Sequence, residues 1–290
     1  MSHKSPLKTR TERLRNMLLR GLIAVLLALP YRWRVPICGW VMAYIIAPLA
    51  GYDKRVRENL ALILPDLPEA EVKRMMRAVP RNVGRTLIEI YSGAEFVARA
   101  TAEPLTGDGL AALDAAHAAG RPVILVTGHF GNYDASRAAL IARGYRVGAL
   151  YRPMGEAAFN DHYVKAISRI GTPVFPRGRA GLGDMVRFLR SGGMLGLLID
   201  QHIGHGVPLA FFGHPAMTAL SAAELALKYD ALVVPTYAVR RPGGLDFDII
   251  IEAPIPHGSA AEMTQALNDS LERLVRKHLD QWFWIHRRWK

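Results

Sequence analysis

The sequence has little cysteine and too few acidic residues to balance its bases. Cys38 is the single cysteine among 290 residues, which excludes an intrachain disulfide and fits a reducing compartment. Against 37 lysines and arginines stand 25 aspartates and glutamates, a formal charge of +12. Such an excess predicts an anionic partner, whether nucleic acid, an acidic carrier protein or an anionic lipid surface.

The sequence also lacks an uninterrupted apolar run long enough to cross a bilayer. Residues 22–29 and 35–52 are apolar, but each run is shorter than the ~20 residues that a spanning helix needs. Pro36 and Pro48 are expected to leave only 37–47 unbroken. Because basic residues flank both runs, we expect a hairpin or interfacial helices at anionic head groups, with the remaining chain on the cytoplasmic side.

Two other interpretations of this N-terminal segment compete with a membrane anchor. A cleaved signal peptide is disfavoured, because Arg20 interrupts the approach to the apolar run and no small-x-small site precedes a polar segment. A pair of buried core helices is the second alternative, since apolar helices of this length also occur inside soluble proteins.

Several kinds of catalytic apparatus are missing. There is no G-x-S-x-G motif, and the one cysteine lies in the N-terminal apolar segment, so no serine or cysteine nucleophile is evident. His202, His205 and His214 could suggest a metal, but they lie among glycines and prolines, and no cysteine or carboxylate pair completes a site. The glycine-rich residues 178–183 lack the G-x-G-x-x-G order. We therefore expect neither a metal nor a bound cofactor.

From residue 105 onward, short apolar runs alternate with stretches of helical periodicity. The predicted strands are 122–127, 146–150, 173–175, 194–200, 232–239 and 246–252. The predicted helices between them are 108–119, 133–143, 156–169, 180–191 and 218–229. A capping box of Ser259 and Glu262 opens a last helix. This order predicts an α/β fold with a mostly parallel central sheet flanked by helices.

The part before residue 105 has a different character. Residues 53–103 are predicted to be helical, with a break at 65–68 and a kink or boundary at Pro80. We therefore divide the chain into a basic, membrane-associated helical segment (1–52) and a catalytic domain (53–290). The catalytic domain contains a helical lead-in (53–103) and an α/β core (104–290).

One histidine lies where parallel sheets build their sites. His129 follows a predicted strand, within the sequence GHFGNYD at 128–134. Asn132 can cap the next helix, which places Asp134 in its first turn. A carboxylate there could orient one imidazole nitrogen and leave the other free to accept a proton from a hydroxyl or amine of the substrate. The alternative is a structural loop histidine beside a helix-capping aspartate.

Seven motifs in order along the chain resemble the late acyltransferases of lipid A biosynthesis, the lauroyl/myristoyl group of the lysophospholipid acyltransferase superfamily. One of them is the H-x-x-x-x-D motif at 129–134. The others are RVRENLALILPDLP (55–68), NVGRTLIE (82–89), YRP (151–153), LRSGGMLGLLIDQ (189–201), PLAFFGHPAMT (208–218) and QWFWIHRRWK (281–290). The resemblance runs from about residue 50 to residue 290.

The resemblance implies an enzyme on the cytoplasmic face of the bacterial inner membrane. It would transfer an acyl chain from acyl carrier protein to a hydroxyl of a lipid A precursor, with His129 as general base and Asp134 as the group that orients it. The arginines among the implied substrate contacts would bind acceptor phosphates, because guanidinium groups bind phosphate bidentately. The implied substrate contacts are Arg152, Asn160, Arg177, Asp200 and Gln201.

Other functions stay open at this point. The same fold could acylate a lysophospholipid, an ornithine lipid or a glycolipid, and a basic, non-catalytic membrane-surface or nucleic-acid-binding protein is a more distant alternative. The C-terminal WFWIHRRWK could stack on bases or lie at a membrane interface. The apolar helices at the other end favour the interface, so no nucleic-acid partner is expected. Residues 202–207 depart from the family pattern, and no role is transferred to them.

Overall fold

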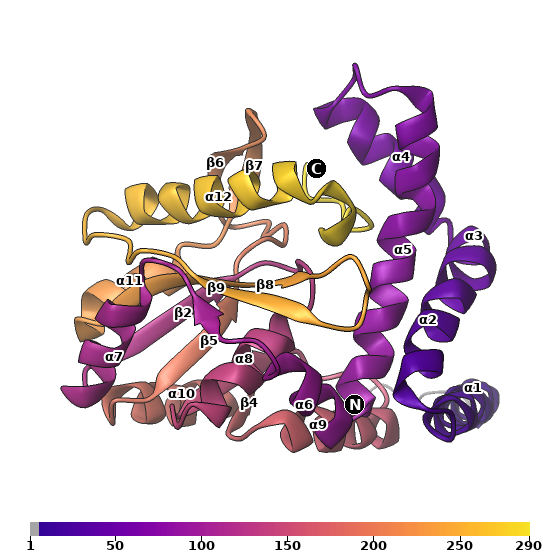
Figure 1. The fold of residues 1–290 in the computed structure, drawn as a ribbon, viewed down its shortest axis with the longest axis horizontal. Coiled ribbons are helices and arrows are strands. Elements are labelled where there is room, and N and C mark those ends of the chain that lie inside the picture. Colours follow the sequence, from indigo (N-terminus) through magenta and orange to yellow (C-terminus); the bar gives the residue numbers. More distant parts are fainter. Residues whose placement is uncertain (1–5) are drawn as a thin grey trace.

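The computed structural model describes residues 6–290 and is built around a seven-stranded sheet (Figure 1). The strand order is β1-β9-β8-β2-β5-β3-β4, in which β8 and β9 pair antiparallel and the other neighbours pair parallel. The strands are β1 (Leu105–Thr106), β2 (Val123–Thr127), β3 (Val147–Tyr151), β4 (Val174–Pro176), β5 (Met194–Leu198), β8 (Leu232–Arg240) and β9 (Phe247–Ile251). The predicted α/β fold with a mostly parallel sheet is confirmed.

Helices cover both faces of the sheet because successive residues of a buried strand point to opposite sides. In β2, Val123 and Leu125 pack into one core cluster, whereas Ile124 and Val126 pack into another. The first cluster joins the sheet to α6 (Ala94–Ala100), α7 (Leu110–Ala118), α8 (Tyr133–Ala142) and α9 (Ala157–Ile170). The second joins it to α10 (Arg179–Arg190), α11 (Ser221–Tyr229) and α12 (Ala260–Lys277).

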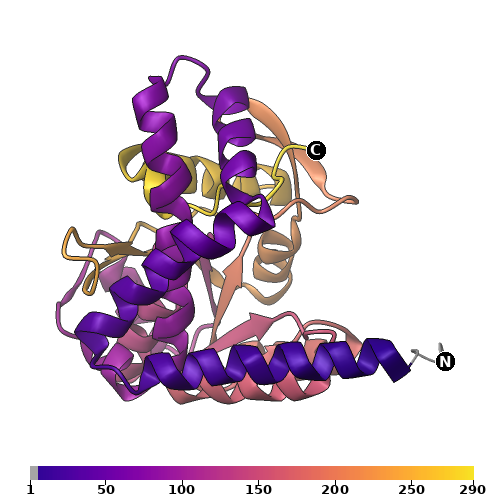
Figure 2. The same cartoon turned by 90° about the vertical axis from the view of Figure 1, so that its right-hand side faces the viewer.

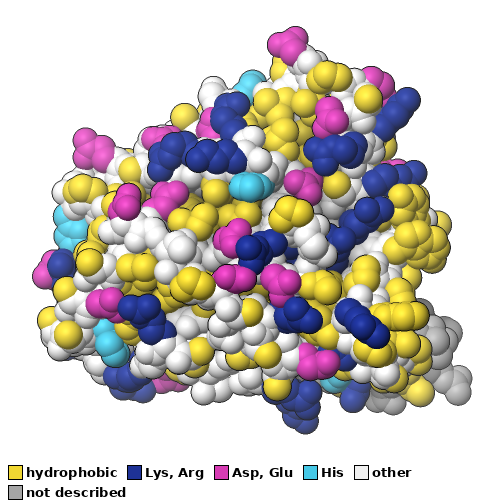
Figure 3. Space-filling view, viewed as in Figure 1, with side chains coloured by type: hydrophobic (Ala, Val, Ile, Leu, Met, Phe, Trp, Pro, Cys, Tyr) yellow, Lys and Arg dark blue, Asp and Glu magenta, His cyan; other side chains and the backbone are white. Residues whose placement is uncertain are grey.

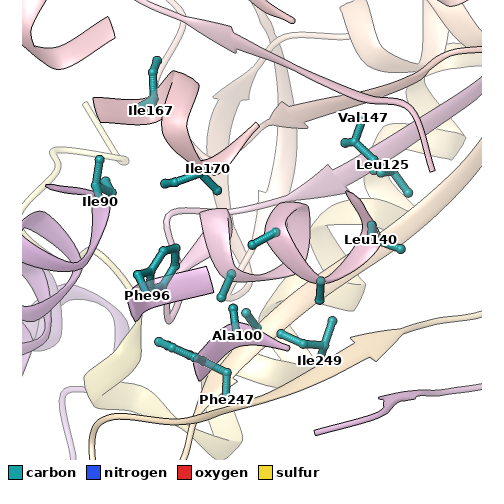
Figure 4. Close-up of a cluster of buried hydrophobic side chains, with 14 of the residues drawn as sticks. Ile90, Phe96, Ala100, Leu125, Leu140, Val147, Ile167, Ile170, Phe247 and Ile249 are labelled. Carbon is teal, nitrogen blue, oxygen red and sulfur yellow. The ribbon is translucent and has the colours of Figure 1, made fainter. Parts of the chain in front are cut away.

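Figure 4 shows how the first of these clusters is filled. Branched side chains of the sheet, such as Leu125 and Val147, lie near Leu140 of α8, and Phe96 of α6 lies near Phe247 of β9 (Figure 4). Phe96 and Phe247 contact edge to face, with ring centroids 5.9 Å apart. Core packing of this kind fixes the position of α8, and with it the loop that joins β2 to α8.

The N-terminal part is a set of helices packed against one edge of the α/β unit (Figure 2). The helices are α1 (Pro6–Leu27), α2 (Tyr31–Val41), a π-helical segment (Met42–Ile46), α3 (Ala47–Ala50), α4 (Tyr52–Ile63) and α5 (Glu69–Tyr91). Residues 1–5, Lys4 among them, and the basic side chains before Asn16 lie outside the described part, so their predicted contact with head groups has no structural account. The predicted division at 52/53 falls at the start of α4 and stays a prediction.

The prolines of this part lie within helices, so the expectation that only 37–47 would stay unbroken was wrong, whereas at Pro80 the structure excludes a helix boundary and the predicted kink stays a prediction. Pro36 lies inside α2, Pro80 lies inside α5, and helical structure is continuous from Tyr31 to Ala50. Proline removes one backbone hydrogen bond from a helix. Tertiary packing offsets that loss, since the face that carries Val35, Cys38, Ala43 and Ala47 is buried.

Two glycines allow α2 and α5 to cross at close range. A Cβ added to Gly84 of α5 would lie 2.6 Å from the Cβ of Met42 and 2.7 Å from the carbonyl oxygen of Cys38. A Cβ added to Gly39 of α2 would lie 2.9 Å from the carbonyl oxygen of Arg81. Real Cβ atoms do not approach other atoms this closely, so the crossing of the two helices requires a glycine at position 84.

One face of the N-terminal helices exposes large apolar side chains. The stretch Tyr31–Ala50 has 20 residues and a mean hydropathy of 1.4, and by length and composition it alone among the described helices could cross a membrane. However, 39% of its most apolar window is buried inside the protein. The apolar residues exposed along α1–α3 are Met17, Leu19, Leu22, Val25, Trp33, Ile37, Trp40, Tyr44, Ile45 and Leu49. Hydrophobic side chains gather along the edge formed by α2 and α3 (Figure 3).

Two further features lie outside what the sequence predicts. A separate hairpin of β6 (Val207–Phe211) and β7 (His214–Thr218) follows β5. The C-terminal segment, expected at a membrane interface, is instead part of the core, where Trp282 and Trp284 are at most 1% exposed. The rings of Phe211, Phe212, Trp282, Trp284 and Trp289 pack against one another, which removes their apolar surface from water.

Candidate active site

His129 lies in the loop that leads from the carboxyl end of β2 into α8. Gly128 makes room for this loop, since a Cβ there would lie 3.0 Å from the Oδ2 atom of Asp200. Gly131 has a φ of 53°, and a Cβ at this position would lie 1.9 Å from the carbonyl oxygen of Ala238. Asn132 caps α8 by accepting a hydrogen bond from the backbone N–H of Asp134, as the sequence predicts.

The carboxylate that contacts His129 belongs to Asp200. The Nδ1 atom of His129 lies 2.8 Å from Oδ1 of Asp200, and the backbone N–H of His129 donates to Oδ2 at 2.6 Å. The two residues meet because β2 and β5 are parallel neighbours, with Thr127 paired to Leu198, so both loops leave the same edge of the sheet. The contact places the ring proton on Nδ1 and leaves the lone pair of Nε2 as the acceptor.

Asp200 remains ionised in this arrangement. The Asp200 side chain is buried, which disfavours its charged form. The charge interaction with His129 outweighs this effect, together with hydrogen bonds from the His129 ring, the His129 backbone and the Trp282 indole. The pKa of Asp200 is therefore held below its ordinary value. An ionised carboxylate on Nδ1 stabilises the imidazolium that forms when Nε2 takes a proton.

Asp134 occupies a different place from the one expected. Its Oδ1 accepts from the Nε atom of Arg137 at 2.8 Å, and both side chains are buried. Arg137 also donates to the carbonyl oxygens of Ile167 and Gly171 at the end of α9. The prediction that Asp134 orients His129 is therefore corrected, because an arginine one helical turn away engages this carboxylate while Asp200 engages the imidazole.

Two cavities meet at His129, whose side chain is 25% exposed. The first, about 270 Å³ in volume, lies between α5 and the C-terminal segment and includes Val83, Leu87, Ile90 and Phe283 in its lining. The second, about 300 Å³, lies at the carboxyl ends of β3–β5 and includes Arg152 and Arg177 in its lining. Gln201 lines both cavities, and its amide nitrogen is 3.4 Å from Nε2 of His129. The free ring nitrogen thus lies between an apolar and a basic compartment.

A smaller apolar cavity of about 70 Å³ continues into the interior. Tyr133 and Tyr163 line both this cavity and the one beside α5. The Asp134–Arg137 pair forms part of its wall, together with Leu125, Leu140 and other apolar side chains of β2, β3 and α8.

Comparison with known proteins identifies the family. The profile of the bacterial lipid A biosynthesis acyltransferases matches residues 2–290. The chain belongs to this family. It is therefore an acyltransferase, and membership implies a lipid acceptor for the acyl group.

Several curated relatives of this acyltransferase cover most of its length. The lipid A biosynthesis lauroyltransferase of Escherichia coli K12 is 26% identical over 244 residues, covering 82% of this chain and 78% of that protein. The lipid A biosynthesis acyltransferase of Haemophilus influenzae is 24% identical over 246 residues, covering 81% and 76%. The phosphatidylinositol mannoside acyltransferase of Mycobacterium tuberculosis H37Rv is 26% identical over 245 residues, covering 82% and 78%.

The remaining predicted site residues of the acyltransferase divide into two groups. Arg152 and Arg177 are exposed at the second cavity, and neither forms an ion pair within the part of the chain that the structure describes. Asn160 instead shapes the loop that carries Arg152, because its Oδ1 accepts from the backbone N–H of Met154 at 2.9 Å. Asp200, expected to touch substrate, is 3% exposed and acts on His129.

Of the three histidines considered for a metal, His202 contacts the C-terminal segment through its backbone. The backbone N–H of His202 donates to the Nε2 atom of His286 at 2.9 Å. This acceptor role needs a neutral ring, and burial lowers the pKa of His286 to about 4. Among residues 6–290, no three His, Cys, Asp or Glu side chains gather as a metal site would require.

A buried polar network that sequence reasoning missed holds the loop between β2 and α8, on the side away from His129 in sequence. Glu89 of α5 accepts from the Asn132 amide at 2.8 Å and from both terminal nitrogens of Arg240 on β8. Thr86 donates to the carbonyl oxygen of Gly131 at 3.0 Å. The NVGRTLIE motif contains Thr86 and Glu89, so its match to the family was a signal for these contacts.

Proposed function

We propose that this acyltransferase moves a fatty acyl chain from the thioester of an acyl carrier protein to a hydroxyl group of a lipid A precursor. The observation that carries the proposal is the His129–Asp200 pair, whose free imidazole nitrogen opens toward two cavities. A general base with space on two sides suits a reaction that joins two bulky substrates. The two lipid A acyltransferases among the relatives support this choice of acceptor.

In the proposed reaction, Nε2 of His129 takes the proton of the acceptor hydroxyl while its oxygen attacks the thioester carbonyl. Asp200 stabilises the imidazolium that results. When the tetrahedral intermediate collapses, the carbon–sulfur bond breaks, an ester forms, and the imidazolium returns the proton to the departing thiolate. Gln201 lies beside the reacting atoms, and its amide N–H can donate to a substrate oxygen there.

The two cavities suggest where the parts of the substrates bind. The cavity beside α5 is lined mainly by apolar side chains and suits a hydrocarbon chain. Arg152 and Arg177 line the other cavity, and their guanidinium groups suit the phosphate of an acceptor head group. Under this assignment the chain and the charged group of the substrates approach His129 from opposite sides.

The exposed apolar face of α1–α3 supports a location at the cytoplasmic face of the bacterial inner membrane. Trp33, Trp40 and Leu49 are 52–86% exposed, whereas the opposite face packs on α5. A helix that is buried on one side cannot be surrounded by lipid, so we favour insertion into one leaflet over a full crossing. The net charge of +12 adds attraction to anionic head groups.

A second acceptor class has support of its own. The phosphatidylinositol mannoside acyltransferase of M. tuberculosis matches the chain at the same identity and coverage as the E. coli lauroyltransferase. A glycolipid acceptor would use the same base and the same basic cavity. Acyl transfer from carrier protein to a lipid A precursor and to a phosphatidylinositol mannoside, measured side by side by mass spectrometry, separates the two.

The test of the base uses His129→Ala, with His205→Ala as a matched control on an exposed loop. The proposal expects His129→Ala to lose ~10²–10⁴-fold in turnover, the usual contribution of general base catalysis. The control should retain normal turnover. Wild-type turnover by His129→Ala would refute the mechanism. The natural acceptor is a separate question, which mass spectrometry of lipid A from cells without the gene would answer.

A further inference from the structure

The C-terminal segment forms one wall of the active site. After α12 the chain turns back between α12 and α5 (Figure 1). It then runs antiparallel to the catalytic loop, where Phe130 and Trp282 form a β-bridge. The backbone N–H of Phe283 donates to the carbonyl oxygen of His129 at 3.0 Å, and that of Gly131 donates to the carbonyl oxygen of Gln281 at 2.9 Å.

Trp282 brings a hydrogen-bond donor to the carboxylate behind His129. Its indole N–H donates to Oδ2 of Asp200 at 2.9 Å, and the residue is 1% exposed. The indole packs edge to face against the ring of Phe211, with ring centroids 5.3 Å apart, and lies inside the buried aromatic cluster. A ring packed this closely cannot leave its place without disturbing the cluster.

The Trp282 indole adds a second donor to the Oδ2 atom of Asp200. Oδ2 accepts from the backbone N–H of His129 and from the Trp282 indole, whereas Oδ1 contacts Nδ1 of His129. Without the indole, Oδ2 would keep one donor, and the buried carboxylate would be held from the His129 side only. Rotation of the carboxylate would then change the contact that orients the imidazole.

We propose that Trp282 is a positioning residue of the acyl transfer, which fixes the Asp200 carboxylate so that Oδ1 stays on the imidazole of His129. The inference rests on the proposed role of His129 and Asp200. It assigns the tryptophan a part in turnover without contact to either substrate's reacting atoms. The indole bond also favours the ionised carboxylate, in keeping with the lowered pKa of Asp200.

The chain offers a matched control for this proposal. Trp284 is 0% exposed, belongs to the same aromatic cluster and donates its indole N–H to the carbonyl oxygen of Leu279 at 2.6 Å. Trp282→Phe and Trp284→Phe therefore remove the same atoms from the same cluster and break one indole hydrogen bond each. They differ in that the first variant also removes the donor to Asp200.

The experiment measures kcat and KM for both substrates, with thermal unfolding of the full-length protein as the measure of stability. Trp282→Phe should lose ~10-fold in kcat, the scale of a hydrogen bond to a charged group, with KM within about twofold of wild type. Trp284→Phe should lose a similar amount of stability and keep its kcat. Equal kcat in the two variants would overturn the proposal.

A double-mutant cycle tests whether the effect of Trp282 on kcat depends on Asp200, which a purely structural role would not require. If Trp282 acts through Asp200, Trp282→Phe should have no further effect on kcat in an Asp200→Asn background. Full additivity of the two losses would also overturn the proposal.

Should Trp282→Phe fail to fold, benzothienylalanine at position 282 keeps the ring shape and replaces the N–H by sulfur. Wild-type kcat in that variant would refute the role of the donor, whereas an active His129→Ala variant would refute the proposed function itself.

Discussion

At the scale of single residues, the molecule uses its two carboxylates near His129 for different tasks. Asp134 is paired with Arg137, which also binds two carbonyl oxygens at the end of α9. Asp200 is paired with the imidazole. The first pair joins α8 to α9 beside the innermost cavity, and the second pair orients the proposed base, His129.

Asparagine substitutions should separate the two tasks. Asp134→Asn leaves the buried Arg137 charge unpaired, and breaking such a pair typically costs ~3–5 kcal/mol of stability. Asp200→Asn should instead lower kcat by a factor on the order of 10² or more while changing stability less, because the carboxylate that stabilises the imidazolium is gone. Thermal unfolding and turnover, measured on both variants, check the assignment. It would be contradicted if Asp134→Asn remained as stable as wild type but lost turnover.

His286 should make the fold sensitive to moderate acid. Its pKa is lowered from 6.5 to about 4 in the folded protein, mainly by burial, so between these values the unfolded chain binds a proton that the folded chain does not. Stability from this group is therefore fully present above pH 6.5 and falls toward pH 4, by at most ~1.4 kcal/mol per pH unit. His286→Gln keeps an acceptor for the N–H of His202 and does not titrate. Denaturant unfolding at pH 7, 6 and 5 should be less pH-dependent in this variant, and an identical pH dependence would contradict the assignment.

At the scale of elements, the α2–α5 crossing depends on the absence of one side chain. A methyl group at Gly84 would meet Met42 and the backbone of Cys38, whereas a methyl group at Gly21 of α1 would meet nothing within 4 Å. Gly84→Ala should therefore destabilise the protein by ~1–3 kcal/mol through overpacking. Gly21→Ala should be neutral or stabilising by up to ~1 kcal/mol, because alanine is the better helix former. Chemical denaturation of the two variants tests the crossing, and equal effects would argue against it.

The apolar face of α2 and α3 should hold the protein on membranes without supporting its fold. Changing Trp33, Trp40 and Leu49 together to serine removes exposed apolar surface, so the protein should move from the membrane pellet to the supernatant with its unfolding temperature little changed. Leu182 and Leu227, exposed elsewhere, provide a control pair of leucine-to-serine changes. If the triple variant stayed in the pellet after a salt wash, the face would not be the anchor.

Sequence periodicity could predict most of the elements but not how they meet. The strands from 122 to 252 were predictable because each is a short, buried apolar run between turn residues. The β6–β7 hairpin was not, since Pro208 and Pro215 lie in its strands and proline disfavours that assignment. Pro36 misled in the opposite direction, because packing between helices outweighed the local preference.

The candidate site illustrates the same limit. His129 was predictable from its place after a strand, and Asn132 from its capping position. The contact with Asp200 depends on β5 lying next to β2, and the contact with Trp282 depends on how the segment after α12 turns back. Strand order and chain reversal are tertiary features, so a nearby carboxylate in sequence, Asp134, was a reasonable but wrong partner.

At the scale of the whole molecule, the excess of positive charge should act on the two substrates unequally. If the proposed donor is correct, an acidic carrier protein meets the enzyme by diffusion, so its association should weaken as the Debye length falls from ~10 Å at 0.1 M salt to ~3 Å at 1 M. A phosphate held by Arg152 and Arg177 inside a cavity should be screened less. Added salt should therefore raise the KM for carrier protein more steeply than the KM for lipid, as steady-state kinetics in fixed detergent would measure.

The variant for this prediction is Arg177→Ala, with Arg190→Ala on the exposed end of α10 as its control. Arg177→Ala should raise the KM for the lipid and leave that for the carrier protein nearly unchanged. The control should leave the lipid KM unchanged. A loss confined to the carrier protein in Arg177→Ala would show that this arginine serves the other substrate.

The late position of Trp282 along the chain also has a consequence for how the enzyme is made. Chains emerge from the ribosome with their N-terminal part first, and early segments can fold before later ones exist. The apolar helices before residue 50 are therefore available to a membrane long before residue 282 has been synthesised. Since His129, Asp200 and Trp282 come together through contacts across the whole α/β unit, the assembled site forms after these helices have had time to reach the lipid. Biosynthesis in this order would complete the active site only after the N-terminal helices have had time to bind the membrane.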